Sequence, residues 1–379
     1  MHRRVGSVLL SLLAVRTLET WTPRRGVSIP CMSVLDPDGG VIEEDQRRLT
    51  RYLIQRGRGA DILFAMGTTG EWNRLDAARR HRVIQIVVEE ARKAQPRLAE
   101  RGDPPVEAWV GITAPTRRET LETLDLALDL GADAGVIAPL ALGDVDDPVR
   151  FMQRDVADLL DARECRLPLF LYDNADIASG RNVRLRTRQV KALSRLDFVR
   201  GIKVSAPPRR LGHYAKAARQ FRDLGAFAVY IGNAPYIFDM MRPRRGFVGT
   251  LLEHWNRFLV RDMLPAGVVA GPANLLPREW QRAWQVSCAG DVERMDQMRG
   301  LIQRFRTICT FSGVRLTNPA VKRGLLRLGV ISSDAMASGN RGLLAEEAAQ
   351  FDAAFEELRA EIEAQLPERW RSDPAEATA

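Results

Sequence analysis

Lys203 is the residue whose chemical type stands out most in this sequence. Only five of the 56 lysine and arginine residues are lysines, and this one lies in the apolar stretch 198–204, which is typical of a buried strand. Unlike a guanidinium, an amine can lose its proton when desolvated and attack a carbonyl carbon to form a Schiff base. The alternative interpretation is a lysine at a strand end with its head in water. The surrounding elements decide between the two.

Other polar residues follow the ends of two further apolar stretches. Tyr172 ends the stretch 169–172, and Thr68 and Thr69 follow the stretch 62–65 directly after Gly67. Neighbouring parallel strands lie about 4.8 Å apart, so residues at their ends can converge on one small molecule. A phenol beside an amine can shuttle the protons needed to make and break a carbinolamine. Glycine-flanked hydroxyls and amides suit a carboxylate or a phosphate, although a plain turn would have the same sequence.

Several other chemistries lack their residues. The four histidines (His2, His81, His213 and His254) show no H-x-x-x-H spacing or carboxylate cluster, so a metal-dependent aldolase or hydrolase would lack its ligands. There is no G-x-S-x-G elbow and no phosphate-binding P-loop. The four cysteines are far apart and form no C-x-x-C, which indicates a reduced, cytoplasmic protein.

The charge pattern argues against nucleic-acid and membrane partners. The formal charge is +8 and the pI about 9.7, but acidic residues are interspersed with the arginines and no nucleic-acid-binding motif accompanies them. Residues 1–22 contain a short apolar stretch without a small-x-small cleavage site. We interpret them as an N-terminal extension, and no other segment has the ~18 apolar residues of a transmembrane helix.

Apolar stretches alternate with amphipathic ones from Gly26 onward, which is typical of βα units and a parallel sheet. Helix starts are predicted at Asp76, Thr116 and Asp147, and Gly131 is a predicted C-terminal cap. Eight strands with intervening helices over about 250 residues predict a (β/α)₈ TIM barrel within the α/β class, at residues 23–276. The predicted strands are 27–33, 62–65, 108–112, 135–138, 169–172, 199–204, 228–231 and 268–270.

Two regions fall outside the regular alternation. The connection between strands 7 and 8 is unusually long and is predicted to hold an inserted helical segment at about 241–264. Residues 277–371 are predicted to be additional C-terminal helices packed on the barrel flank, at 278–289, 292–310, 320–328 and 343–366. Residues 372–379 are predicted to be a disordered tail.

These motifs, taken in order, make the chain resemble the class I aldolase superfamily of dihydrodipicolinate synthase and N-acetylneuraminate lyase. The resemblance runs from about Gly26 to Gly329, with similar spacings apart from the long insertion. Its motifs are Gly67-Thr-Thr-Gly-Glu71, Tyr172 at a strand end, Gly201-Ile-Lys203, Gly232-Asn233, Gly267-Val-Val-Ala270 with Asn274, and Asn318-Pro-Ala-Val-Lys322.

The resemblance implies a role for each matching residue. Lys203 would form the Schiff base with the ketone of a 2-oxo acid such as pyruvate, and Tyr172 would relay protons. Thr68 and Thr69, with Gly67, would hold the substrate carboxylate, and Gly232 and Val269 would line the substrate site. The family is typically homotetrameric or dimeric and needs no metal or cofactor, so the expected partners are a small 2-oxo acid and further copies of the chain.

Two departures separate the chain from the synthase pattern. The synthase carries an arginine shortly after its fifth-strand tyrosine, where this chain has Asp176-Ile-Ala-Ser179, and Arg181 is displaced. It also carries a tyrosine pair after the fourth strand, where this chain reads Pro139-Leu-Ala-Leu142. The expected function is therefore a Schiff-base lyase, an aldolase or dehydratase acting on another 2-oxo acid. A genuine 4-hydroxy-tetrahydrodipicolinate synthase and a non-catalytic 2-oxo-acid-binding protein are the alternatives.

Overall fold

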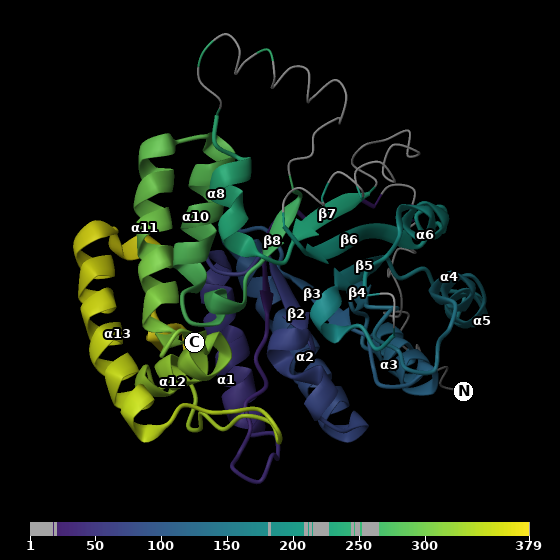
Figure 1. Ribbon diagram of the computed structural model, residues 1–379, viewed down its shortest axis with the longest axis horizontal. Coiled ribbons are helices and arrows are strands. Elements are labelled where there is room, and N and C mark those ends of the chain that lie inside the picture. The colour runs from purple at the N-terminus through teal and green to yellow at the C-terminus, as the bar shows by residue number, and fades with distance from the viewer. Residues whose placement is uncertain are drawn as a thin grey trace, which may run out of the picture.

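Eight parallel strands form a closed barrel in the computed structural model, which describes residues 18, 21–180, 183–207, 211, 214, 227–243, 246, 251 and 265–378 (Figure 1). Each strand pairs with the next along the chain, and β8 pairs with β1. The predicted (β/α)₈ barrel is confirmed, and every predicted strand is present within three residues at each end. The strands are β1 Gly26–Pro30, β2 Ile62–Ala65, β3 Glu107–Gly111, β4 Ala134–Ile137, β5 Leu169–Asn174, β6 Val199–Ser205, β7 Ala228–Ile231 and β8 Gly267–Val269.

Helices outside the barrel connect successive strands. The predicted helix starts are confirmed, because the side chains of Asp76, Thr116 and Asp147 each accept a backbone N–H from the first turn that follows. Gly131 follows α3 with a φ of +64°, a conformation that costs a glycine little. These helices are α1 Glu43–Ile54, α2 Ala77–Glu100, α3 Arg117–Asp129, α4 Pro148–Phe151, α5 Ala157–Ala162 and α6 Thr187–Leu193.

Aromatic rings fill the end of the barrel where the strands begin. Trp109, Phe170 and Tyr230 come from β3, β5 and β7, with ring centroids 4.2 to 5.4 Å apart. Trp21 adds an edge contact to Phe170 at 5.9 Å, and Arg200 Nη2 donates to the Trp21 carbonyl at 3.1 Å. Trp21, which falls within the predicted N-terminal extension, therefore packs against the barrel core.

Four further helices follow β8 and pack on one flank of the barrel (Figure 1). The prediction of C-terminal helices is thus confirmed. They are α10 Pro277–Ala289, α11 Val292–Ile308, α12 Thr317–Arg327 and α13 Ala345–Gln365, with a two-stranded hairpin, β9 Thr310–Phe311 and β10 Val314–Arg315, between α11 and α12.

The prediction of a disordered tail at 372–379 is wrong for the residues that the structure describes. Ser372 N donates to a carboxylate oxygen of Glu279 at 2.9 Å, and Asp373 N donates to Gln55 Oε1 at 3.0 Å. Glu376 is buried and pairs with Arg278 at 3.1 Å. The polar composition suggested disorder, but these residues satisfy charged groups that would otherwise be buried without partners.

We expect removal of residues 372–379 to destabilise the fold by roughly 2–5 kcal/mol, because Arg278 and Glu279 are buried and would lose their partners. Burial raises the pKa of Glu279, and the hydrogen bonds from Ser372 oppose that rise. Urea unfolding of the truncated and full-length chains would measure the difference. Equal unfolding midpoints would contradict this assignment, and removal of Ala379 alone is the control.

Two predicted segments fall mostly outside the described residues. Of the inserted segment at 241–264, only residues 241–243, 246 and 251 are described, after α8 Ile237–Met240. Of the N-terminal extension, only Leu18, Trp21 and Thr22 are described. In the part of the chain that the structure describes, no helix combines the length and apolarity needed to cross a bilayer.

Candidate active site

The cluster of interest lies at the carboxyl ends of β5 and β6. Tyr172 pairs with Lys203 in the strand register, and Asn174 pairs with Ser205. Side chains two residues apart on a strand share a face. An ideal Cβ at Gly201 would lie 2.5 Å from the Phe170 ring in the barrel interior, so Lys203 and Ser205 also face inward. The register therefore places an amine, a phenol, an amide and a hydroxyl at one end of the barrel.

Lys203 is enclosed by aromatic rings. Its side chain is 7% exposed, and its Nζ lies 3.9 Å from the ring centroid of Tyr172 and 4.9 Å from that of Phe64. Burial lowers the pKa of Lys203 from its ordinary value of 10.5, and the neighbouring Tyr172 offsets this only in part. A lowered pKa increases the fraction of neutral amine, which is the nucleophilic form.

The Tyr172 hydroxyl is the centre of a hydrogen-bond network. It lies 3.3 Å from Thr68 Oγ1 and 3.3 Å from Ser205 Oγ, and it accepts from Asn174 Nδ2 at 3.1 Å. Burial alone would raise the pKa of Tyr172, but the positive charge of Lys203 and these three partners outweigh burial and lower it. The phenol is thus suited to exchanging protons with groups bound above Lys203.

The loop after β2 carries the two predicted threonines. Thr68 and Thr69 lie in the short helix η2 Thr68–Gly70, and the Thr68 hydroxyl reaches Tyr172. An ideal Cβ at Gly67 would lie 2.8 Å from the Phe64 ring, and one at Gly271 would lie 3.2 Å from Thr69 Oγ1. Thr69 therefore borders the loop after β8, and a side chain at position 67 would force the loop away from the barrel.

The structure brings most of the predicted site residues together. Lys203, Tyr172 and Thr68 form one cluster, and an ideal Cβ at Gly232 would lie 2.3 Å from Ser205 Oγ in the same cluster. Val269 is buried in β8, which β7 separates from β6. Within the described residues, no group of three or more His, Cys, Asp or Glu side chains is placed to hold a metal ion.

Sequence reasoning gave no role to Asn174 and Ser205. Each lies two residues after a predicted catalytic residue, Tyr172 and Lys203 respectively. The alternation of side chains along a strand places both on the same inward face. This two-residue spacing is the sequence signal that could have identified Asn174 and Ser205.

A buried ion pair behind the threonine loop was also missed. Lys322 Nζ lies 2.7 Å from Glu71 Oε2, and both side chains are 1% exposed. Glu71 also accepts the Ala337 backbone N–H at 3.1 Å, and Lys322 donates to the Ala335 carbonyl at 2.7 Å. Glu71 directly follows the loop that carries Thr68 and Thr69, and Lys322 belongs to α12. The ion pair therefore links this loop to the C-terminal helices.

Comparisons with known proteins agree with this geometry. A model of the dihydrodipicolinate synthetase family matches residues 23–135. The 4-hydroxy-tetrahydrodipicolinate synthase of Methanothermobacter thermautotrophicus is 25% identical over 276 residues, which are 71% of this chain and 81% of the relative. That of Pelobacter propionicus is 27% identical over 300 residues, 78% of this chain and 86% of the relative. The chain is thus similar to members of the dihydrodipicolinate synthetase family.

The matches within this family differ in extent. The synthase of Geotalea uraniireducens is 34% identical, but over only 100 residues, 26% of this chain and 30% of the relative. Solved structures share the fold: a dihydrodipicolinate synthase from Bacteroides thetaiotaomicron has a TM-score of 0.70 at 21% identity, covering 89% of this chain and all of that one. A sialic acid aldolase from Ruminococcus gnavus has a TM-score of 0.70 at 15% identity, with 90% and 99% covered.

The loops after β4 and β5 carry the two departures from the dihydrodipicolinate synthase sequence pattern. Residues 173–180 contain no arginine, and Arg181 lies outside the described residues. Ser179 N donates to the Leu140 carbonyl at 2.9 Å, and Ser179 Oγ donates to the Leu142 carbonyl at 3.1 Å. Where the synthase pattern has tyrosine and arginine side chains, this chain joins the two loops through a serine.

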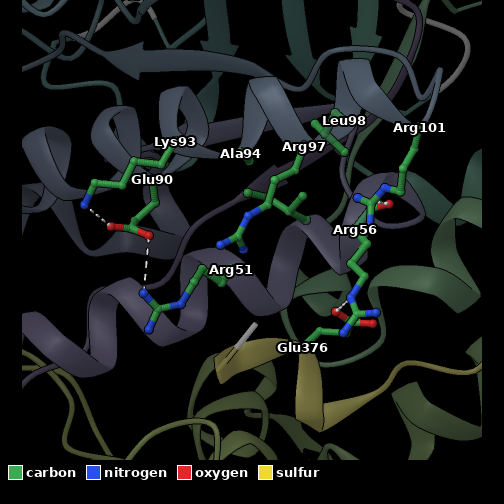
Figure 2. A pocket seen from close by; sticks show the side chains of 10 residues that line it. Arg51, Arg56, Glu90, Lys93, Ala94, Arg97, Leu98, Arg101 and Glu376 are labelled. Atoms are coloured by element: carbon green, nitrogen blue, oxygen red, sulfur yellow. Dashed lines mark hydrogen bonds and ion pairs between the residues drawn. The ribbon is translucent and has the colours of Figure 1, made fainter.

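A separate cavity of about 380 Å³ lies away from this cluster, between α1, α2 and the C-terminal segment (Figure 2). Its carboxylates already have partners: Glu90 pairs with Lys93 at 2.8 Å and Arg51 at 3.4 Å, and Glu376 pairs with Arg56 at 2.6 Å. Figure 2 shows these pairs along its walls. The arrangement anchors the C-terminal segment to α1 and α2 and brings no nucleophile and base together.

Proposed function

We propose that this protein is a class I aldolase-type lyase in which Lys203 forms a Schiff base with the ketone of a 2-oxo acid such as pyruvate. The observation that carries the proposal is the buried Lys203 amine beside the Tyr172 phenol, with the pKa of both groups lowered. Relatives support it. A family member from E. coli K12 was solved in complex with pyruvate, and the R. gnavus sialic acid aldolase was also solved as a catalytic lysine mutant.

The chemistry follows from the positions of these groups. The neutral Lys203 amine attacks the ketone carbon to give a carbinolamine, and loss of water, with a proton delivered through Tyr172, gives the imine. The protonated imine then accepts the electron pair released when a carbon–carbon bond breaks or a proton leaves. Thr68 and Thr69, with the Gly67 backbone, would hold the substrate carboxylate, and Gly232 and Val269 would line the site.

The substrate should differ from that of 4-hydroxy-tetrahydrodipicolinate synthase, because residues 173–180 offer no arginine to hold a second carboxylate. We therefore favour an aldolase or dehydratase that acts on another 2-oxo acid. A coupled assay with pyruvate and aspartate semialdehyde tests the synthase alternative directly. A barrel that only binds a 2-oxo acid would be stabilised thermally by the ligand in both wild-type and Lys203→Ala protein.

Borohydride trapping tests the proposed function. Wild-type protein incubated with pyruvate, or with a panel of 2-oxo acids, and then reduced should gain the mass of one adduct, and peptide mapping should place it at Lys203. Lys93 is an internal control, because it is exposed and paired with Glu90 and should gain no adduct. A folded protein that gains no adduct from any member of the panel would count decisively against the proposal.

Tyr172→Phe should lower the rate of imine formation by about 10²–10⁴-fold, because it removes a proton-transfer group. The amine remains, so the final yield of borohydride adduct after long incubation should approach that of the wild type. Stopped-flow kinetics and endpoint trapping separate the two effects. A wild-type rate in the variant would remove Tyr172 from the mechanism.

We also expect the protein to be cytoplasmic and to form a homotetramer or a homodimer. One structural neighbour is described as a monomeric dihydrodipicolinate synthase variant, so a monomer is the alternative outcome. Analytical ultracentrifugation would determine the oligomeric state.

A further inference from the structure

Asn174 is a buried amide at the end of β5 with no role in the chemistry described above. Its side chain is 8% exposed, and its backbone pairs with Ser205 of β6. It shares the inward face with Tyr172, two residues earlier. A buried amide at this position is costly unless its hydrogen bonds are satisfied, so its contacts indicate what it does.

Two contacts determine the orientation of the Asn174 amide. Its Oδ1 accepts the backbone N–H of Asp176 at 3.2 Å, where Asn174 caps a short helix. Its Nδ2 therefore points to the other side and donates to the Tyr172 hydroxyl oxygen at 3.1 Å. An amide nitrogen can only donate, so the phenol oxygen must accept there. The phenol proton is left for Thr68, Ser205 or a bound substrate.

We propose that Asn174 is a positioning residue that orients the Tyr172 phenol for proton transfer. This inference rests on the proposed function, because it assumes that Tyr172 transfers protons to and from the Lys203 adduct. The tyrosine pair of the synthase pattern after the fourth strand is absent here, whereas the Asn174 amide donates a hydrogen bond to the Tyr172 phenol oxygen at 3.1 Å.

The electrostatic surroundings of Tyr172 make the effect measurable. Lys203 on β6 is the charged group that acts on the phenol, whereas Thr68, Ser205 and Asn174 are neutral. Asp173 on the same strand faces the opposite side and accepts from Tyr214. A neutral donor favours the phenolate over the phenol, so Asn174 contributes to the lowered pKa of Tyr172. Tyr172 can then give up and take back its proton closer to neutral pH.

The test compares Asn174→Leu and Asn174→Asp with the wild type. The leucine removes the donor at similar size, and the aspartate replaces it with a negative charge. The ultraviolet phenolate titration of each protein, after subtraction of the same variant carrying Tyr172→Phe, isolates Tyr172 among the five tyrosines. We expect its midpoint to rise by about one pH unit in Asn174→Leu and further in Asn174→Asp.

The acid limb of the pH profile of imine formation should move in the same direction, with a roughly tenfold slower rate at neutral pH. Endpoint adduct yield should be unchanged, because Lys203 is intact. Asn73→Leu, at an exposed asparagine, is the matched control and should leave the Tyr172 midpoint where it is.

An unchanged Tyr172 midpoint and rate in a folded Asn174→Leu protein would overturn the inference while leaving the Schiff base intact. Absence of any adduct in the wild type would instead overturn the proposed function. If Asn174→Leu does not fold, Asn174→Asp and Asn174→Ser decide by the same midpoint, with serine expected to retain part of the donor and lie between wild type and aspartate.

Discussion

Lys203→Met and Lys203→Arg are each expected to abolish the pyruvate adduct and to lower turnover by about 10⁴-fold or more, the scale at which loss of a covalent nucleophile acts. Arginine keeps the positive charge but has no nucleophilic amine at physiological pH. The two variants together therefore separate charge from nucleophilicity. Mass spectrometry after borohydride treatment and steady-state kinetics supply the measurements.

Lys203→Met should raise the stability of the folded protein rather than lower it. The pKa of Lys203 in the folded state lies below 10.5 because of burial, so the protonated amine destabilises the fold. That penalty is fully present below the folded-state pKa and disappears as the pH rises from there towards 10.5. Lys203→Met should therefore have a higher Tm than the wild type at pH 7, with a gap that narrows in alkali. A variant less stable than the wild type at pH 7 would contradict the assigned surroundings of the amine.

Lys322→Met is expected to destabilise the protein by about 3–5 kcal/mol, which is the usual cost of leaving one partner of a buried ion pair alone. Glu71 is 1% exposed and would lose its charge partner to an apolar side chain. Because Glu71 directly follows the loop that carries Thr68 and Thr69, activity should fall too, although Lys322 touches none of the reacting groups. Urea unfolding and the KM for the 2-oxo acid report the two effects.

Two comparisons make this prediction specific. The double variant Glu71→Gln/Lys322→Met removes both charges and should recover a large part of the stability lost in Lys322→Met. Lys93→Met breaks an ion pair with Glu90 in which the lysine is 63% exposed, and it should cost less than about 1 kcal/mol. Equal losses in Lys322→Met and Lys93→Met would mean that burial of the Glu71 pair does not matter.

The barrel was predictable because its signals are local. Each strand is a short apolar run, and the helices begin at side chains that cap their own first turn, as Asp76 and Thr116 do. Lys203 and Tyr172 were identifiable because a strand's end is visible in the sequence and parallel strands place such ends together. These inferences needed only the order of elements.

The features that were missed depend on partners distant in the sequence. Ser372 is held by Glu279, and Asp373 by Gln55, across 93 and 318 residues respectively. The local sequence of residues 372–379 does not indicate those partners. Likewise, Glu71 and Lys322 are 251 residues apart, and only the packing of α12 against the barrel shows that the two charges compensate each other.

The aromatic layer at the start of the strands has a kinetic consequence. Trp109, Phe170 and Tyr230 occupy the barrel below Lys203, and Trp21 packs beneath them. The barrel is therefore closed at the end where its strands begin, and ligands enter and leave at the carboxyl ends of the strands. With a 2-oxo acid bound to Lys203, as proposed, any second reactant would have to arrive after it and depart before it. In the cleavage direction, product release should therefore be ordered, with the 2-oxo acid held by Lys203 leaving last.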